Sequence, residues 1–304
     1  MTDPLAQSDA PVFGDYAAEY EEWGRPQRAA AARLAEQALA LNAPGAFLDA
    51  PGDRRIASAA SEDAPGPAGE TPGGSLDATG AGGAARGLQR WLDVGAGTGF
   101  IQDALARAGV LNRLRLINVD SSLVMLRFAA VRRGAAGVCA DAAALPFAQG
   151  VFDHVLSSFC YHWLADPGAF LGEVHRCLRP GGWLSLAVPV TGSLKGFYEI
   201  LAPLAHRVDY HLNFDLYPDV SSVRQALGRT PLAVEKQAIE EFAYRPRTVR
   251  EMLLFMRFAA AGRIVRRRHE GDFWRFAARL VRLGRPVPIV FRTLFVHARR
   301  VEPQ

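Results

Sequence analysis

The residues best suited to chemistry lie in a glycine-rich segment and in an acid that follows it. Residues 92–99 read Leu-Asp-Val-Gly-Ala-Gly-Thr-Gly, which predicts a buried strand, a glycine turn and the start of a helix. Asp120 ends the next apolar run, residues 114–120. Glycines let the backbone and a helix N-terminus approach a ligand, and a carboxylate after the second strand can accept hydrogen bonds from ribose hydroxyls. The pattern therefore predicts a site for a nucleoside-containing cofactor.

The spacing of the small residues distinguishes two kinds of cofactor. Gly95, Gly97 and Gly99 form Gly-x-Gly-x-Gly, whereas dinucleotide-binding folds use Gly-x-Gly-x-x-Gly/Ala to seat a pyrophosphate. Asp93 stands just before the turn and suits a cationic group better than a phosphate. A nicotinamide-dependent oxidoreductase is therefore the weaker alternative. The segment resembles motif I of the class I S-adenosylmethionine-dependent methyltransferases, whose cofactor presents an amino group, a carboxylate, a sulfonium, a ribose and an adenine.

The elements that must position these residues continue the resemblance. Further strands are predicted at residues 137–141, 150–158 and 183–188, and a helix begins at Asp166-Pro167 and ends in the turn 178–182. The resemblance covers about residues 91–189. It implies an α/β fold, namely a doubly wound, mostly parallel sheet of seven strands with helices on both faces, a helical N-terminal lid and a small cap.

The resemblance also implies which residues contact the cofactor. The acid at the end of the third strand, Asp141, would accept a hydrogen bond from the adenine amino group, and the next backbone amide would meet a ring nitrogen. The expected cofactor-binding set is Tyr20, Arg28, Asp93, Gly95, Gly97, Gly99, Asp120, Ser121, Asp141, Ala142 and Ser158.

The N-terminal arm narrows the resemblance. Residues 13–20 and Gln27-Arg28 are similar to the opening of the malonyl-[acyl-carrier protein] O-methyltransferases of biotin synthesis. In related enzymes this arm folds over the cofactor as a lid, which implies that Tyr20 faces the methionine part and Arg28 meets its carboxylate. The alternative is that Tyr20 is a core residue and Arg28 a solvated helix residue.

The reaction that this resemblance implies needs no strong catalytic base from the protein. A malonyl carboxylate is already ionised at pH 7, so methylation requires positioning and exclusion of water rather than a strong base. We expect Tyr20, His162 and Trp163 to position the acceptor, with His162 as a base the weaker interpretation. Two other functions remain open: methylation of a small molecule such as a quinone precursor, and an assembly factor that transfers no methyl group.

The chain divides into three parts by composition. Residues 1–49 are the expected lid arm and helix, and residues 89–304 the methyltransferase domain, with a cap at 193–230. Between them, 26 of the 39 residues from 50 to 88 are Gly, Ala, Pro or Ser and none is aromatic. Such a segment buries too little apolar surface to offset chain entropy, so we expect a disordered insertion.

Charge and composition bear on partners. The net charge is only +4, yet residues 245–300 hold 15 Arg and three acids. This basic region, densest at Arg266, Arg267 and Arg268, fits an acidic acyl carrier protein better than a nucleic acid. The alternative is that these arginines lie on solvated helix faces. No apolar run is long enough to span a membrane, the first ten residues do not predict a signal peptide, and the Cys and His spacings predict no metal site. We therefore expect a cytoplasmic protein.

Overall fold

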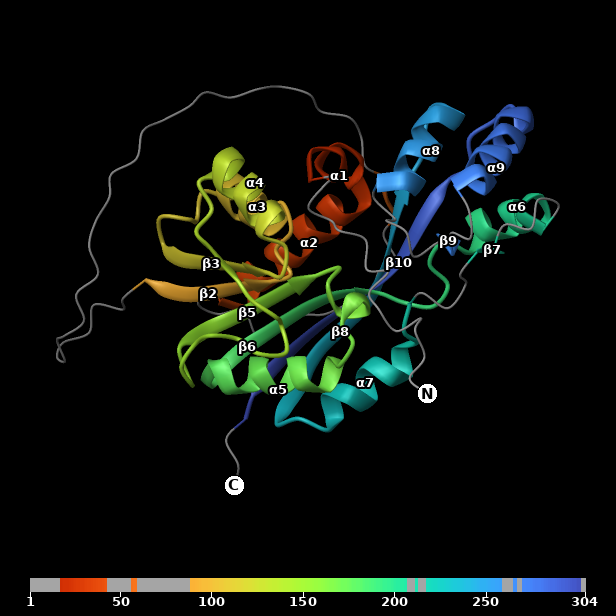
Figure 1. Ribbon diagram of the computed structural model, residues 1–304. Coiled ribbons are helices and arrows are strands. Elements are labelled where there is room, and N and C mark those ends of the chain that lie inside the picture. Colours follow the sequence, from red (N-terminus) through yellow and green to blue (C-terminus); the bar gives the residue numbers. More distant parts are fainter. Residues whose placement is uncertain are drawn as a thin grey trace, which may run out of the picture.

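The computed structural model describes residues 17–42, 56–58, 88–206, 211–212, 217–258, 265–266 and 270–301. These residues build a central β-sheet with helices on both faces (Figure 1). The strand order is β1-β8-β10-β6-β5-β2-β3-β4. The strands are β1 (Ile56–Ser58), β2 (Gln89–Val94), β3 (Leu114–Asp120), β4 (Gly137–Cys139), β5 (Phe152–Ser158), β6 (Leu178–Pro189), β8 (Leu232–Tyr244) and β10 (Ile289–Arg300).

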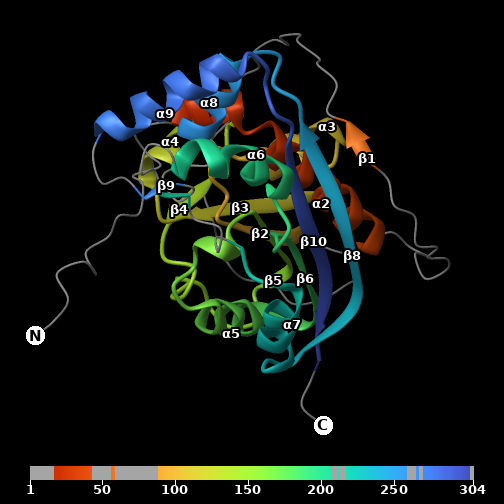
Figure 2. The same cartoon turned by 90° about the vertical axis from the view of Figure 1, so that its right-hand side faces the viewer.

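Five neighbouring strands, from β4 to β6, run parallel. Strand β10 is antiparallel to both β6 and β8, and the two long strands β8 and β10 form one side of the sheet (Figure 2). The predicted doubly wound, mostly parallel sheet of seven strands is thus confirmed. The short β1 adds an eighth strand, which pairs in parallel with the last part of β8.

Helices cover the two faces of the sheet and enclose two separate cores. On one face lie α2 (Arg25–Asn42), α3 (Phe100–Arg107) and α4 (Leu123–Arg133), and on the other α5 (Pro167–Cys177) and α7 (Val220–Gly228) (Figure 1). Leu34, Trp91 and Phe295 are fully buried in the first core, and Phe152 and Phe170 in the second. Both sides of the central strands are apolar because both are covered.

Short local signals set the helix starts that border the site. Asp166 caps α5, since its Oδ1 accepts a hydrogen bond from the amide of Ala169 at 2.9 Å, and Pro167 occupies the first turn as predicted. Ser122 caps α4 by accepting from the amide of Met125. Both caps lie just after the carboxyl end of a strand or a short helix, so they fix where the chain turns back over the sheet.

A group of further helices lies at one end of the sheet (Figure 1). It comprises α1 (Ala17–Trp23), α6 (Lys195–His206), α8 (Val249–Phe258) and α9 (Glu270–Leu283), with a small sheet of β7 (His211–Leu212) and β9 (Val265–Arg266). Helix α6 packs on α9 and β10, and α1 packs on α4 and α8. Helices α1 and α6 therefore belong to the same end of the sheet (Figure 1), whereas α7, the last part of the predicted cap, packs on α5.

Some boundaries differ from the sequence expectation. Strand β6 begins at Leu178, inside the predicted turn, because Leu178 pairs with Phe152 before a register shift. Strand β8 was not predicted. Strand β1 falls within the predicted insertion 50–88, of which all but residues 56–58 and 88 lie outside the described residues, as do the arm residues 13–16. None of the described helices combines the length and apolar character needed to cross a membrane.

Candidate functional site

A cavity of about 580 Å³ opens where β2, β3 and β5 end. The glycine turn after β2 forms its floor, and Tyr20 from α1 and Tyr217 from the cap line it from other sides. Eleven of the predicted site residues line it: Tyr20, Asp93, Gly95, Gly97, Asp120, Ser121, Asp141, Ala142, Ser158, His162 and Trp163. Ligands bind at this edge in open α/β sheets.

The glycine turn is held by the next strand. The amides of Gly95 and Ala96 both donate to the carbonyl of Val119, at 2.8 and 3.0 Å. A Cβ on Gly95 would lie 2.4 Å from the Sγ of Cys160, so a larger residue does not fit. Gly97 has a φ of +55°, and a Cβ there would meet no atom within 4 Å among the described residues. The turn therefore presents bare backbone to the cavity at Gly97.

Asp93 is a buried carboxylate with no partner in the described part of the chain. The residue is 1% exposed, and neither of its carboxylate oxygens accepts a hydrogen bond there. Burial raises the pKa of Asp93 to about 8, and the nearby charge of Asp120 adds to this rise. An unpaired buried carboxylate is costly, so the cavity is prepared for a cationic group or a hydrogen-bond donor at this point.

The two other acids are held by backbone amides. Asp120 accepts from the amide of Gly97 through Oδ2 and from that of Ser122 through Oδ1, both at 2.8 Å. Burial raises the pKa of Asp120, and these two hydrogen bonds partly oppose the rise. Asp141 accepts from the amide of Ala143 at 2.9 Å. Each carboxylate is thereby oriented and still has lone pairs for a ligand.

Aromatic side chains line another part of the cavity. His162 lies with its ring centre 5.2 Å from that of Tyr217, 5.1 Å from Trp163 and 6.2 Å from Phe159. Phe291 from β10 packs on Phe159 and Tyr217. No lysine or arginine is present among the described residues that line the cavity. Sequence reasoning missed Phe159, Tyr217 and Phe291, because they come from three segments far apart in the sequence and carry no motif.

The two arm residues of the predicted set lie in different places. Tyr20 lines the cavity and stacks on Phe100, with ring centres 5.7 Å apart. Arg28 does not line it: its guanidinium donates to the carboxylate of Glu21 at 2.6 Å and lies over the ring of Phe100. Gly99 is also outside the lining and precedes the first residue of α3 with a φ of +91°. The structure thus brings Tyr20 to the cavity but not Arg28.

Known proteins resemble this chain over its central region. Residues 92–186 match the family described as "Methyltransferase domain". The chain is 33% identical over 140 residues to a biotin biosynthesis bifunctional protein BioHC of Cellvibrio japonicus, covering 45% of this chain and 26% of that protein. It is 30% identical over 167 residues to a malonyl-[acyl-carrier protein] O-methyltransferase of Laribacter hongkongensis, covering 50% and 53%.

A relative of different specificity matches equally well. A demethylmenaquinone methyltransferase of Corynebacterium urealyticum is 40% identical over 109 residues, which cover 36% of this chain and 45% of that protein. The chain therefore spans about half, or less, of the length of the curated relatives it matches.

By this match, residues 92–186 form a methyltransferase domain, and the sheet order and the glycine turn are those expected of the class I fold, which implies S-adenosylmethionine as the cofactor. Within this class the chain resembles the malonyl-[acyl-carrier protein] O-methyltransferases. The cavity fits the cofactor, because its unpaired acid Asp93 and its bare glycine turn provide for an amino group and for close backbone contact. No group of His, Cys, Asp or Glu that could hold a metal ion occurs in the described ranges.

Proposed function

We propose that this protein transfers a methyl group from S-adenosylmethionine to the free carboxylate of a malonyl group carried by an acyl carrier protein, forming the methyl ester that begins biotin synthesis. The observation that carries the methyl transfer is the cavity with the unpaired Asp93 beside the glycine turn. The acceptor is supported by the similarity of the chain to a malonyl-[acyl-carrier protein] O-methyltransferase and by the resemblance of residues 13–20 and Gln27-Arg28 to the opening of that family.

In this proposal each predicted residue binds a different group of the cofactor. Asp93 would bind the amino group, Asp120 and Ser121 the ribose, and Asp141 and Ala142 the adenine. Gly95 and Gly97 would allow close backbone contact, while Tyr20 would cover the methionine part from α1. Ser158, whose Oγ is buried without a hydrogen bond in the described part of the chain, would offer a further donor. Arg28 could reach the cofactor carboxylate only by leaving Glu21.

The cofactor supplies an electrophilic methyl group on a sulfonium. Transfer of this methyl carbon to a carboxylate oxygen would leave the electron pair of the broken carbon–sulfur bond on sulfur as a neutral thioether. No proton has to move, so the protein contributes orientation and exclusion of water. Tyr20, His162 and Trp163 are the proposed positioning residues, since all three line the cavity.

A second acceptor class is favoured by one feature of the cavity. Its described lining has aromatic rings from Phe159, Trp163, Tyr217 and Phe291 and no lysine or arginine to hold an anion. Such walls suit a planar, uncharged acceptor such as a quinone precursor. The assembly-factor alternative would keep the cofactor site and transfer no methyl group.

The proposed partner is an acidic acyl carrier protein in the cytoplasm. Arg266 belongs to β9, whereas Arg267 and Arg268 lie outside the described residues. On α9, Arg275, Arg279 and Arg282 are spaced to share one face of the helix. This basic helix supports docking of an acidic protein near the cap, by complementary charge.

The test is methyl transfer from radiolabelled S-adenosylmethionine to a panel of acceptors. Purified malonyl-acyl carrier protein, malonyl-coenzyme A, acetyl-acyl carrier protein and a demethylated quinone would be compared, with no acceptor as the blank. Base-labile label on the malonyl carrier alone supports the proposal. Label on the quinone supports the second acceptor class. Binding of S-adenosylhomocysteine without labelling of any acceptor would overturn both and favour the assembly factor.

A further inference from the structure

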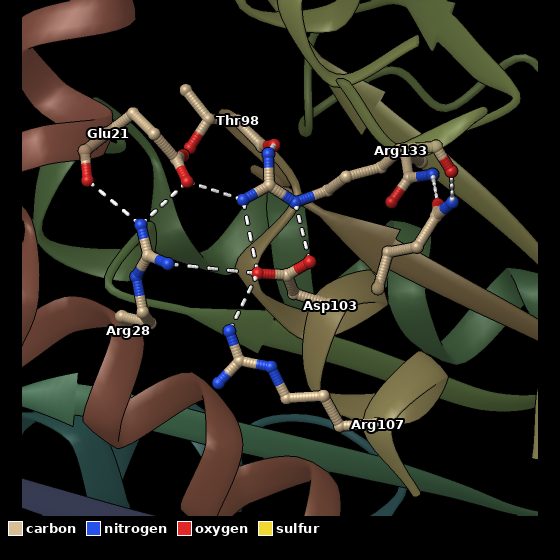
Figure 3. A network of polar contacts seen from close by, with 8 residues as sticks. Glu21, Arg28, Thr98, Asp103, Arg107 and Arg133 are labelled. Atoms are coloured by element: carbon tan, nitrogen blue, oxygen red, sulfur yellow. Dashed lines mark hydrogen bonds and ion pairs between the residues drawn. The ribbon is translucent and has the colours of Figure 1, made fainter. Parts of the chain in front are cut away.

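A buried arginine joins the N-terminal arm to the glycine turn outside the cavity (Figure 3). Arg133 is the last residue of α4, and its side chain is 8% exposed. Its guanidinium contacts the carboxylate of Glu21 at 2.5 Å, the carbonyl of Thr98 at 2.9 Å and the carboxylate of Asp103 at 3.1 Å. One side chain thus connects α1, the turn and α3.

Each end of this connection is next in sequence to a residue that lines the cavity. Glu21 follows Tyr20, which lines the cavity from α1. Thr98 lies between Gly97, which lines the cavity, and Gly99, where an added Cβ would lie 3.2 Å from the Cδ of Arg133. Arg133 itself is not part of the lining. It therefore touches the two structures that would enclose a cofactor without touching the cofactor.

The pairing of charges around Arg133 depends on the arm being docked, because Glu21 belongs to the arm. Burial alone lowers the pKa of Arg133, but the hydrogen bonds and charges of Glu21 and Asp103 outweigh this and raise it. Glu21 is 11% exposed and is also paired with Arg28. Removing one member of a buried pair leaves an uncompensated charge. Departure of α1 would leave Arg133 with Asp103 as its remaining carboxylate partner and would open to water the side of the guanidinium that Glu21 covers, which disfavours release of the arm.

We propose that Arg133 is a positioning residue that couples docking of the arm α1 to the shape of the glycine turn. Cofactor bound at the turn would thereby favour the docked arm, and the docked arm would favour the cofactor, because such coupling is reciprocal. This inference rests on the proposed cofactor site but on no particular acceptor. The experiment that tests it therefore measures ligand binding rather than methyl transfer.

The experiment measures binding of S-adenosylhomocysteine by calorimetry and amide hydrogen exchange of α1 with and without this ligand. In the wild-type protein the ligand should slow exchange in α1. In Arg133→Gln the dissociation constant should rise about tenfold, within the usual range of coupling between sites, and the ligand-dependent protection of α1 should be lost. Arg107→Gln is the matched control, because Arg107 contacts the same Asp103 but is 71% exposed and makes no contact with Glu21 or Thr98 that the structure shows.

A double-mutant cycle separates coupling from loss of stability. Glu21→Gln removes the arm's end of the contact, and it also serves if Arg133→Gln fails to fold. If the contact acts as proposed, the double variant binds no more weakly than the worse single variant. Additive losses, or a lower Tm for Arg133→Gln with unchanged affinity and unchanged protection of α1, would overturn the inference. Absence of binding to the wild-type protein would instead overturn the cofactor site itself.

Discussion

Among the residues of the site, the acid before the glycine turn leads to the most direct tests. Asp93 is buried and has no partner in the described structure, and burial raises its pKa to about 8. A cationic ligand group binds best to the ionised carboxylate, so binding should release a proton below that pH. The residue is therefore destabilising in the free protein and useful only when the ligand is present, as is common for functional groups.

The first prediction concerns the pH dependence of this interaction. Between pH 6 and pH 7.5 the affinity for S-adenosylhomocysteine should rise with pH, approaching about tenfold per unit, because the carboxyl of Asp93 releases one proton for each ligand bound below its pKa. Asp93→Asn should remove most of this slope and weaken binding about a hundredfold at pH 7.5, since a buried charge partner is lost. Calorimetric titrations at three pH values would measure both effects. A slope in the variant equal to that of the wild type would assign it to another group.

The same substitution should act in the opposite direction on the ligand-free protein. The folded-state pKa of Asp93 lies above its unfolded value, so its contribution to stability falls as the pH rises from about 4 towards 8. Asp93→Asn should therefore raise the Tm of the ligand-free protein at pH 7.5, by about 2–4 °C for each kcal/mol gained. Thermal scans at pH 7.5 and pH 5 would test this, with a smaller gain expected at pH 5. A lower Tm at both values would contradict it.

Gly97 allows the cavity to be blocked without disturbing the fold. A Cβ there meets no described atom, and a non-glycine residue at φ +55° costs about 1–2 kcal/mol. Gly97→Arg should therefore fold with a modestly lower Tm and bind S-adenosylhomocysteine undetectably, because the side chain would enter the cavity. Gly134→Arg is the control, since Gly134 has a similar φ of +61° and open space but lies outside the lining. Equal loss of binding in both variants would point to strain instead.

At the scale of elements, the sequence predicted the features that depend on local signals and missed those that depend on tertiary contacts. The glycine turn and the start of α5 depend on residue types at fixed spacing, and both appear where expected. Strand β8 reads Leu-Ala-Val-Glu-Lys-Gln-Ala-Ile-Glu-Glu-Phe-Ala-Tyr, rich in residues that favour helices. Its pairing with β10 makes it a strand. In the same way, the aromatic lining of the cavity joins residues far apart in sequence, which no motif could predict.

A buried chain of hydrogen-bonded side chains connects three strands and one helix of the molecule, and no sequence motif indicated it. His154 on β5 shares a hydrogen bond of 2.7 Å with Ser185 on β6, which shares another of 2.7 Å with His297 on β10. At its ends, Asn42 contacts His154 and Gln37 contacts His297, both from α2 at 3.0 Å. The chain ties three strands to one helix through neutral imidazoles, and such networks are costly when only partly satisfied.

This network predicts acid sensitivity of the entire fold. Burial lowers the pKa of His154 to about 3 and that of His297 to about 4; the neighbouring His297 adds to the first shift, and the charges of Lys236 and Arg33 add to the second. In the unfolded chain both titrate near 6.5, so their stabilising contribution is complete above about pH 6.5 and is lost progressively as the pH falls towards 4. Two such groups give a slope approaching about 2.7 kcal/mol per pH unit around pH 5.

Urea unfolding at pH 7, 6, 5 and 4.5 would measure this slope against that of His297→Gln. Glutamine keeps a polar group towards Ser185 and Gln37 but takes up no proton. The variant should be less stable at pH 7. Below pH 6, the part of the stability loss that comes from His154 and His297 should be about half as steep in the variant. The comparison isolates His297, because the buried carboxylates Asp93 and Asp120 titrate alike in both proteins and act in the opposite direction, their pKa values being raised. Parallel slopes for the two proteins would mean that His297 already takes up its proton in the folded state, and the buried chain would then be held by a charged imidazole.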